Sequence, residues 1–189
     1  MRQIPHILAA LAVVLLNVPA VKGIFVPRHL AWVYVLVLAF SLTYALMPIV
    51  KWTARKLDAV DQPGGRKTHS EVTPLMGGAA IYLGFALVLF LAQDMLLFSQ
   101  ELKGVALGAT LVFAIGLMDD IWGLSARIRL VAQLLAVGVL LKFGVTLSFL
   151  PQTWWGDAGE ILITVIWVVG ITNAVNFLDG MDGLAAGAS

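Results

Sequence analysis

The amino-acid sequence contains no cysteine, and this absence excludes disulfide bonds and thiolate metal sites. Histidine is scarce as well: His6, His29 and His69 are scattered along the chain and provide no His-rich zinc site. Only 12% of the residues are charged, against about 25% in soluble proteins. The basic residues form no stripe of the kind that binds nucleic acid, so we expect no nucleic-acid partner.

Apolar residues are abundant instead, at 60% of the chain, and the mean hydropathy is +0.95. Long apolar runs separated by short polar segments predict an all-α, polytopic membrane protein with five or six transmembrane helices. The first run is interrupted by Asn17 and Pro19, and it reads either as a signal-type segment or, preferably, as an uncleaved helix. The predicted spans are residues 4–21, 30–50, 75–98, 104–118, 130–150 and 160–177.

The loops between these spans differ in charge. Successive loops alternate between the two sides of the membrane. One side has residues 51–74, residues 119–129 and the segment from 179 onward. The other side has residues 99–103 and 151–159. The positive-inside rule places the first set in the cytoplasm, and Lys22 and Arg28 do not fit this topology. Seven basic residues occupy the first set: Lys51, Arg55, Lys56, Arg66, Lys67, Arg127 and Arg129.

Four polar residues at steps of three follow the apolar run 161–171: Asn173, Asn176, Asp179 and Asp182. A carboxylate at the centre of a bilayer costs about 2.5–3.5 kcal/mol on insertion scales. These carboxylates are therefore expected at the water boundary or around a cation. The alternative is that Asp-Gly-Met-Asp-Gly is only a helix stop followed by a turn.

Two further polar clusters lie on the same predicted side. Residues 61–78 contain two glycines followed by Arg66, Lys67 and His69, which together suit a phosphate group; the alternative is an ordinary basic loop. Asp119 and Asp120 end a predicted span, and adjacent carboxylates repel each other unless a divalent cation or a basic group is present. A solvated helix end is the alternative for this pair. Together the clusters indicate a site for a Mg²⁺-bound diphosphate.

Three motifs carry a resemblance to a known family. They are DQPGGRKTH with TPLMGG, GLMDD followed by Arg129 and Gln133, and NAVNFLDGMDGLAAG. With these motifs in this order, residues 30–189 resemble the polyprenyl-phosphate N-acetylhexosamine-1-phosphate transferases, relatives of the phospho-N-acetylmuramoyl-pentapeptide transferase. Residues 1–29 are then an extra apolar helix or signal-type segment.

The resemblance implies a multi-pass enzyme of the bacterial inner membrane with a cytoplasmic active site. Such an enzyme transfers a sugar-1-phosphate, here with motifs favouring N-acetylglucosamine-1-phosphate, from a UDP-sugar to undecaprenyl phosphate and releases UMP, in cell-envelope polysaccharide synthesis. Mg²⁺ is the implied cofactor, with Mn²⁺ as an alternative, and a homodimer is one assembly that the resemblance leaves open. Family members also carry a later Gly-Asp motif and a His-rich loop that this sequence lacks, so residues 30–189 are expected to be the amino-terminal part of a membrane domain whose carboxy-terminal part is missing.

The resemblance also implies roles for individual residues. Asp119 and Asp120 form the acidic pair near the metal and the lipid phosphate, and Asp119 is expected to activate the acceptor. The implied catalytic residues are Asp119, Asp120, Asp179 and Asp182; the metal ligands Asp120, Asp179 and Asp182; and the substrate-binding residues Arg66, Lys67, His69, Asn173 and Asn176.

Two other functions are weighed against this one. A CDP-alcohol phosphotransferase also uses Asp-Gly pairs in membrane helices, but its pattern has Ala-Arg after Asp-Gly where this chain has Ala185-Ala186. A transporter with an acidic cytoplasmic cavity fits the intramembrane Asn and Asp residues. It would leave the loop from Gly64 to His69 unexplained, and acidic groups on one side alone form no path through the membrane.

Overall fold

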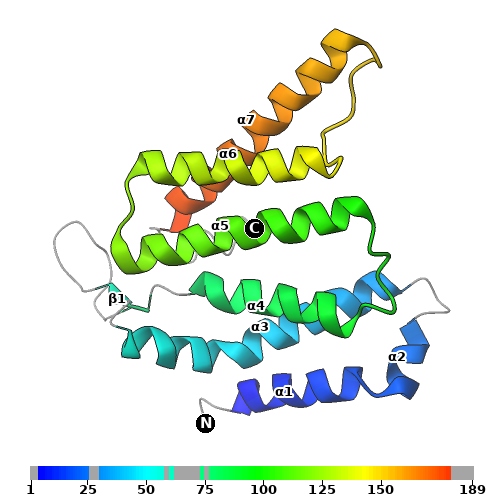
Figure 1. Cartoon of the computed structure of the whole chain (residues 1–189). Coiled ribbons are helices and arrows are strands. Elements are labelled where there is room, and N and C mark those ends of the chain that lie inside the picture. The colour runs from blue at the N-terminus through cyan, green and yellow to red at the C-terminus, as the bar shows by residue number, and fades with distance from the viewer. Residues whose placement is uncertain (1–3, 26–29, 58–59, 62–72, 75–76, 180–189) are drawn as a thin grey trace. The chain divides into compact units, whose positions relative to one another are not determined.

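The computed structural model describes residues 4–25, 30–57, 60–61, 73–74 and 77–179. The chain divides into two compact units, each considered by itself: the first unit is Met1–Asp61 with Pro74–Phe98, and the second unit is Gln62–Thr73 with Ser99–Ser189. The helices are α1 (Ile4–Leu16), α2 (Pro19–Phe25), α3 (Ala31–Lys56), α4 (Gly77–Leu91), α5 (Gln100–Trp122), α6 (Ala126–Lys142) and α7 (Trp154–Asp179) (Figure 1). Two strands of two residues each, β1 (Val60–Asp61) and β2 (Thr73–Pro74), pair with each other.

The all-α, polytopic membrane fold predicted from the sequence is confirmed, with fewer spans than the five or six expected. Among the described residues, α3, α5 and α7 are long and apolar enough to cross a membrane, and the bent pair α1 and α2 would make a fourth span. The helices α4 and α6 have 15 and 17 residues, whereas a span needs about 20.

The helix α6 is shorter than the predicted span 130–150 because of a glycine at its end. Gly144 has a φ of 80°, a left-handed conformation that glycine adopts without strain. The Gly144 N–H donates to the Leu141 carbonyl and the Val145 N–H donates to the Leu140 carbonyl, both over 3.0 Å. This pair of hydrogen bonds is the Schellman motif, which closes a helix and turns the chain away.

The first predicted span is broken at the residues that interrupt its sequence. Pro19 cannot donate a backbone hydrogen bond and disfavours a helical conformation at Val18, so α1 ends and α2 begins with Pro19 as its first residue. Asn17 Nδ2 donates to the Val13 carbonyl over 2.9 Å and thereby satisfies a carbonyl at the end of α1. The two helices meet at 80°.

A proline inside α3 explains a contact between α3 and α1. Pro48 has no N–H, so the carbonyl of Tyr44, four residues earlier, loses its helical partner. His6 Nδ1 lies 2.9 Å from that carbonyl oxygen, and the His6 and Tyr44 rings stack with centroids 4.7 Å apart. Because a carbonyl only accepts, the proton of the imidazole must be on Nδ1. The side chain of His6 therefore replaces the hydrogen bond that Pro48 removes.

We expect His6→Phe to destabilise the protein by about 1.5 kcal/mol, because the ring stack is retained while the Tyr44 carbonyl is left without a donor. In a Pro48→Ala background the helix supplies its own N–H, and the same change at position 6 should then cost less than about 0.5 kcal/mol. The measurement is thermal unfolding of all four proteins in one detergent. Equal losses in both backgrounds would show that His6 acts by packing alone.

The core of the first unit lies where α3 meets α1, α2 and α4. Tyr34 and Leu38 of α3 are fully buried, and Val88 of α4 and Leu16 of α1 pack in the same cluster. Gly84 lies against Thr43 so closely that a Cβ on Gly84 would overlap Thr43 Oγ1. Small residues at such crossings let two membrane helices approach each other closely.

Lys22, which did not fit the predicted topology, is paired with an acidic residue. Its ammonium donates to Asp94 Oδ1 over 2.5 Å and to the carbonyl of Leu91 over 2.9 Å, and its side chain is 16% exposed. The hydrogen bond from Lys22 lowers the pKa of Asp94, so the carboxylate remains charged opposite it. The Leu91 carbonyl, at the end of α4, thus has Lys22 as its hydrogen-bond donor.

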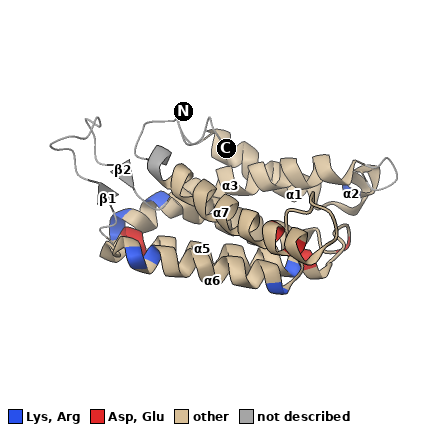
Figure 2. Cartoon of the chain, turned by 90° about the horizontal axis from the view of Figure 1, so that it is seen from above, with Lys and Arg blue, Asp and Glu red and all other residues tan. Residues whose placement is uncertain are grey.

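The second unit consists of α5, α6 and α7. Gly104 and Gly108 of α5 pack on Phe143 and Leu140, so that α5 and α6 lie side by side. Figure 2 shows that the charged residues of these two helices gather at their ends and that the stretch between the ends is uncharged. This distribution suits two helices whose middles are in hydrocarbon and whose ends are at the water boundary.

Candidate functional site

The site begins at the turn between α5 and α6. Gly123 adopts a left-handed φ of 63°, and its N–H donates to the Asp119 carbonyl over 2.8 Å. The Leu124 N–H donates to the side chain of the same residue, at Asp119 Oδ1, over 2.7 Å. The glycine therefore turns the chain so that a backbone N–H fixes the Asp119 carboxylate.

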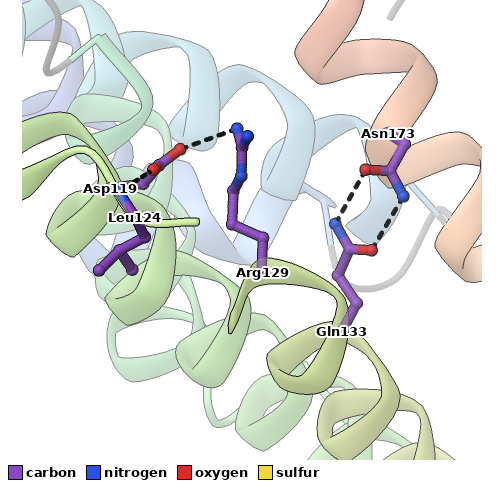
Figure 3. Close-up of polar contacts among 5 residues, drawn as sticks. All are labelled: Asp119, Leu124, Arg129, Gln133 and Asn173. Atoms are coloured by element: carbon purple, nitrogen blue, oxygen red, sulfur yellow. Dashed lines mark hydrogen bonds and ion pairs between the residues drawn. The ribbon is translucent and has the colours of Figure 1, made fainter. Parts of the chain in front are cut away.

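Arg129 holds the other oxygen of this carboxylate. Its Nη1 lies 3.1 Å from Asp119 Oδ2, and the side chains of Asp119 and Arg129 are 18% and 38% exposed (Figure 3). A carboxylate at a helix carboxyl end is unfavourable because the carbonyl ends of the helix carry partial negative charge. The guanidinium and the Leu124 N–H offset that cost. The ion pair also links the end of α5 to the first turns of α6.

A pair of amides connects α6 to α7. Asn173 Nδ2 donates to Gln133 Oε1 over 2.9 Å, and Gln133 Nε2 donates to Asn173 Oδ1 over 3.4 Å (Figure 3). Asn173 Nδ2 also donates to the Val169 carbonyl over 2.8 Å. Gln133 is buried, with 8% of its surface exposed, so these hydrogen bonds replace the water that its amide would otherwise need.

The ion pair and the amide pair line one small cavity of about 100 Å³ in the second unit. Val112, Ile115 and Gly116 of α5 form an apolar wall. A volume of this size holds a few water molecules or a cation with part of its hydration shell. The polar lining consists of Asp119, Arg129, Gln133, Thr172, Asn173 and Asn176.

Three of the residues predicted from the sequence thus line a common cavity: Asp119, Asn173 and Asn176. Asp119 lies more than 50 residues before the two asparagines in the chain. Asp120 is exposed and is not part of this lining. Asp179 is the last residue of α7, and its side chain is not described. The remaining candidates lie outside the described residues: Arg66, Lys67, His69 and Asp182.

A family model described as glycosyl transferase family 4 matches residues 102–189, which include α5, α6 and α7. A Bacillus subtilis protein, the probable undecaprenyl-phosphate N-acetylglucosaminyl 1-phosphate transferase, is 36% identical over 149 residues, which are 76% of this chain and 41% of that protein. Residues 102–189, a little under half of the chain, are thus similar to glycosyl transferase family 4. The resemblance seen in the three motifs is thereby confirmed.

Other relatives carry similar names. The decaprenyl-phosphate N-acetylglucosaminephosphotransferase of Mycobacterium leprae is 37% identical over 162 residues, covering 79% of this chain and 41% of the relative. The undecaprenyl-phosphate alpha-N-acetylglucosaminyl 1-phosphate transferase of Thermotoga maritima is 34% identical over 148 residues, covering 78% and 46%. The chain spans about two fifths of the length of the first curated relatives that it matches. No solved structure matches it.

The cavity has the right kind of ligand atoms for a hard cation but too few of them among the described residues. Among the described residues, no group of three or more His, Cys, Asp or Glu side chains could hold a metal ion. The cavity offers carboxylate oxygens from Asp119 and amide oxygens from Asn173 and Asn176. Mg²⁺ takes one or two carboxylates and completes its shell with water and substrate phosphates. The described donors therefore fit part of a Mg²⁺ shell.

The sequence indicated no site role for Gln133 or Thr172, both of which line the cavity. Thr172 resembles an ordinary helix residue, since its hydroxyl donates to the Val168 carbonyl over 2.7 Å. Gln133 did leave a signal, because an amide within an apolar helix needs a partner. Its partner Asn173 is 40 residues away and could not be identified from the spacing.

Proposed function

We propose that the complete protein transfers N-acetylglucosamine-1-phosphate from UDP-N-acetylglucosamine to undecaprenyl phosphate and releases UMP. The observation that carries this proposal is the cavity on which Asp119, held by Arg129, lies with Asn173 and Asn176. The names of the relatives support the sugar phosphate and the polyprenyl acceptor. Residues 30–189 would supply the amino-terminal part of the catalytic membrane domain.

The net reaction joins two phosphates. A phosphate oxygen of the lipid forms a bond to the β-phosphorus of the UDP-sugar, and the bond from that phosphorus to the bridging oxygen breaks, so that the oxygen leaves with UMP. Asp119 would take the proton of a monoprotonated lipid phosphate. Arg129 holds the Asp119 carboxylate in place and has further N–H groups for a phosphate oxygen. Positioning and charge neutralisation are the main requirements of such a transfer.

A divalent cation, Mg²⁺ or Mn²⁺, would neutralise charge on the two phosphates. Asp120, Asp179 and Asp182 are proposed as its ligands, and Arg66, Lys67 and His69 as further phosphate contacts. The excess of basic residues on the site's side of the membrane supports an inner-membrane protein with a cytoplasmic site. A homodimer remains a prediction from the resemblance.

The test is an assay of the product of the complete open reading frame that contains this chain, purified in detergent. With UDP-N-acetylglucosamine and undecaprenyl phosphate we expect UMP release and a lipid-linked sugar, complete loss of both with EDTA, and recovery with added Mg²⁺. Equal release without the lipid acceptor would contradict the proposal. Uptake of a solute into proteoliposomes with no UMP formed would favour a transporter instead.

A further inference from the structure

We propose that Gln133 is a positioning residue that turns the Asn173 side chain so that only its carbonyl oxygen is available to the cavity. This inference rests on the proposed function for the identity of the ligands.

The contact with the Val169 carbonyl shows which terminal atom of Asn173 is the nitrogen. A backbone carbonyl only accepts hydrogen bonds, so the atom of Asn173 that lies 2.8 Å from it must be the NH₂ nitrogen. The atom of Gln133 that lies 2.9 Å from the same nitrogen must then be its carbonyl oxygen, Oε1. Gln133 Nε2 is consequently left facing Asn173 Oδ1, at 3.4 Å.

The hydrogens and lone pairs of the Asn173 amide determine which hydrogen bonds it can still form with a ligand. An NH₂ group carries two hydrogens, and those of Asn173 are used by Val169 and Gln133. The oxygen has two lone pairs, and Gln133 Nε2 uses one of them. One lone pair of Asn173 Oδ1 remains. Asn173 can therefore accept a hydrogen bond or bind a cation, and it cannot donate to a phosphate oxygen.

Two neighbouring groups of the cavity, Thr172 and Asp119, have the same character, whereas Arg129 is a donor. The Thr172 hydroxyl donates its hydrogen to the Val168 carbonyl. Its oxygen can therefore only accept a further hydrogen bond. The Asp119 carboxylate accepts from Leu124 and Arg129, and each of its oxygens keeps lone-pair capacity. The electropositive partner suited to these acceptors is a hydrated divalent cation or a hydroxyl or amide N–H group of the sugar donor.

Gln133 is suited to position the Asn173 side chain because it is buried. Gln133 is 8% exposed, so leaving its amide unpaired would be costly, and the pair is held against competing water. Groups that orient a ligand-binding side chain typically change affinity by about 10–100-fold when they are removed. The expected effect of removing the Gln133 amide lies at the lower end of that range, because the Val169 contact still restrains Asn173.

The test compares binding of Mn²⁺, measured by electron paramagnetic resonance, and of UDP-N-acetylglucosamine to the complete protein in detergent. Gln133→Met retains the length of the side chain and removes its amide. We expect it to lower the affinity for one of these two ligands about tenfold. A loss confined to Mn²⁺ identifies the cation as the partner of Asn173, and a loss confined to the nucleotide sugar identifies a donor group of the substrate. The matched control is Gln152→Met, an exposed glutamine in the loop before α7, with no expected change.

A second background separates positioning from packing. In Asn173→Asp both terminal atoms are oxygens, so an oxygen faces the cavity whichever way the group turns. Gln133→Met should then weaken binding by less than about twofold in that background, whereas a packing defect would cost the same in both. Equal losses in the two backgrounds, or no loss in either, would overturn the inference. If the unaltered protein binds neither Mn²⁺ nor UDP-N-acetylglucosamine, the proposed function fails instead.

Discussion

Replacement of Asp119 by Asn is expected to lower kcat/KM for lipid-linked sugar formation about 10³-fold, which corresponds to about 4 kcal/mol of lost transition-state stabilisation. The amide has the same shape and can still accept the hydrogen bond that the Leu124 N–H makes at 2.7 Å. It cannot take a proton from the acceptor phosphate, and it leaves the Arg129 guanidinium without its counter-charge. The loss should therefore appear in the chemistry rather than in folding.

The measurement is the initial rate of lipid-linked sugar formation across both substrate concentrations, with thermal unfolding alongside. A fall in kcat with little change in KM for UDP-N-acetylglucosamine is the expected pattern. The control is Asp157→Asn, an exposed carboxylate in the first turn of α7, which should retain the rate of the unaltered protein. Full activity in Asp119→Asn would remove this residue from the catalytic machinery.

Gly84→Leu is expected to destabilise the protein by about 3 kcal/mol, the largest effect on folding that we predict. The new side chain would start from a Cβ that overlaps Thr43 Oγ1 and lies 3.3 Å from the Thr43 backbone nitrogen. Because the obstacle includes backbone and a stiff β-branched side chain, neither can move aside at low cost. The helices α3 and α4 would have to separate.

Thermal unfolding in detergent checks this expectation, and a decrease of about 6–12 °C in Tm corresponds to the stated energy for a chain of this size. Gly78→Leu is the matched control, since Gly78 lies on the same helix and no other atom lies within 4 Å of the Cβ that it would carry. An equal loss of stability in both variants would attribute the effect to the leucine itself rather than to the crossing with α3.

The sequence was sufficient for the fold class, which follows from hydropathy. It also predicted that Asp119 and Asn173 lie together, and the two residues do line one cavity. That prediction relied on counting six spans, whereas the described residues contain three or four candidate spans. Hydropathy could not locate helix ends. At the end of α4 the Leu91 carbonyl accepts from Lys22, which is 69 residues away in the chain, and the end of α6 depends on the conformation of Gly144.

The roles of hydrogen-bond donors and acceptors were also beyond the sequence. Asn173 was expected to bind substrate, but only its contacts with Val169 and Gln133 show that its NH₂ group is already engaged. Likewise, the ion pair of Asp119 with Arg129 could not be inferred from two charges ten residues apart. Such pairings depend on side-chain geometry, which periodicity and composition do not specify.

The contact between His6 and the Tyr44 carbonyl has a consequence for biogenesis. During synthesis α1 emerges before α3, which carries Pro48. The His6 donor is therefore already present when the Tyr44 carbonyl, which has no helical partner, is inserted. Removal of α1 would leave this carbonyl without a donor, at the cost of about 1.5 kcal/mol expected for His6→Phe. The contact therefore makes α1 part of the hydrogen bonding of α3.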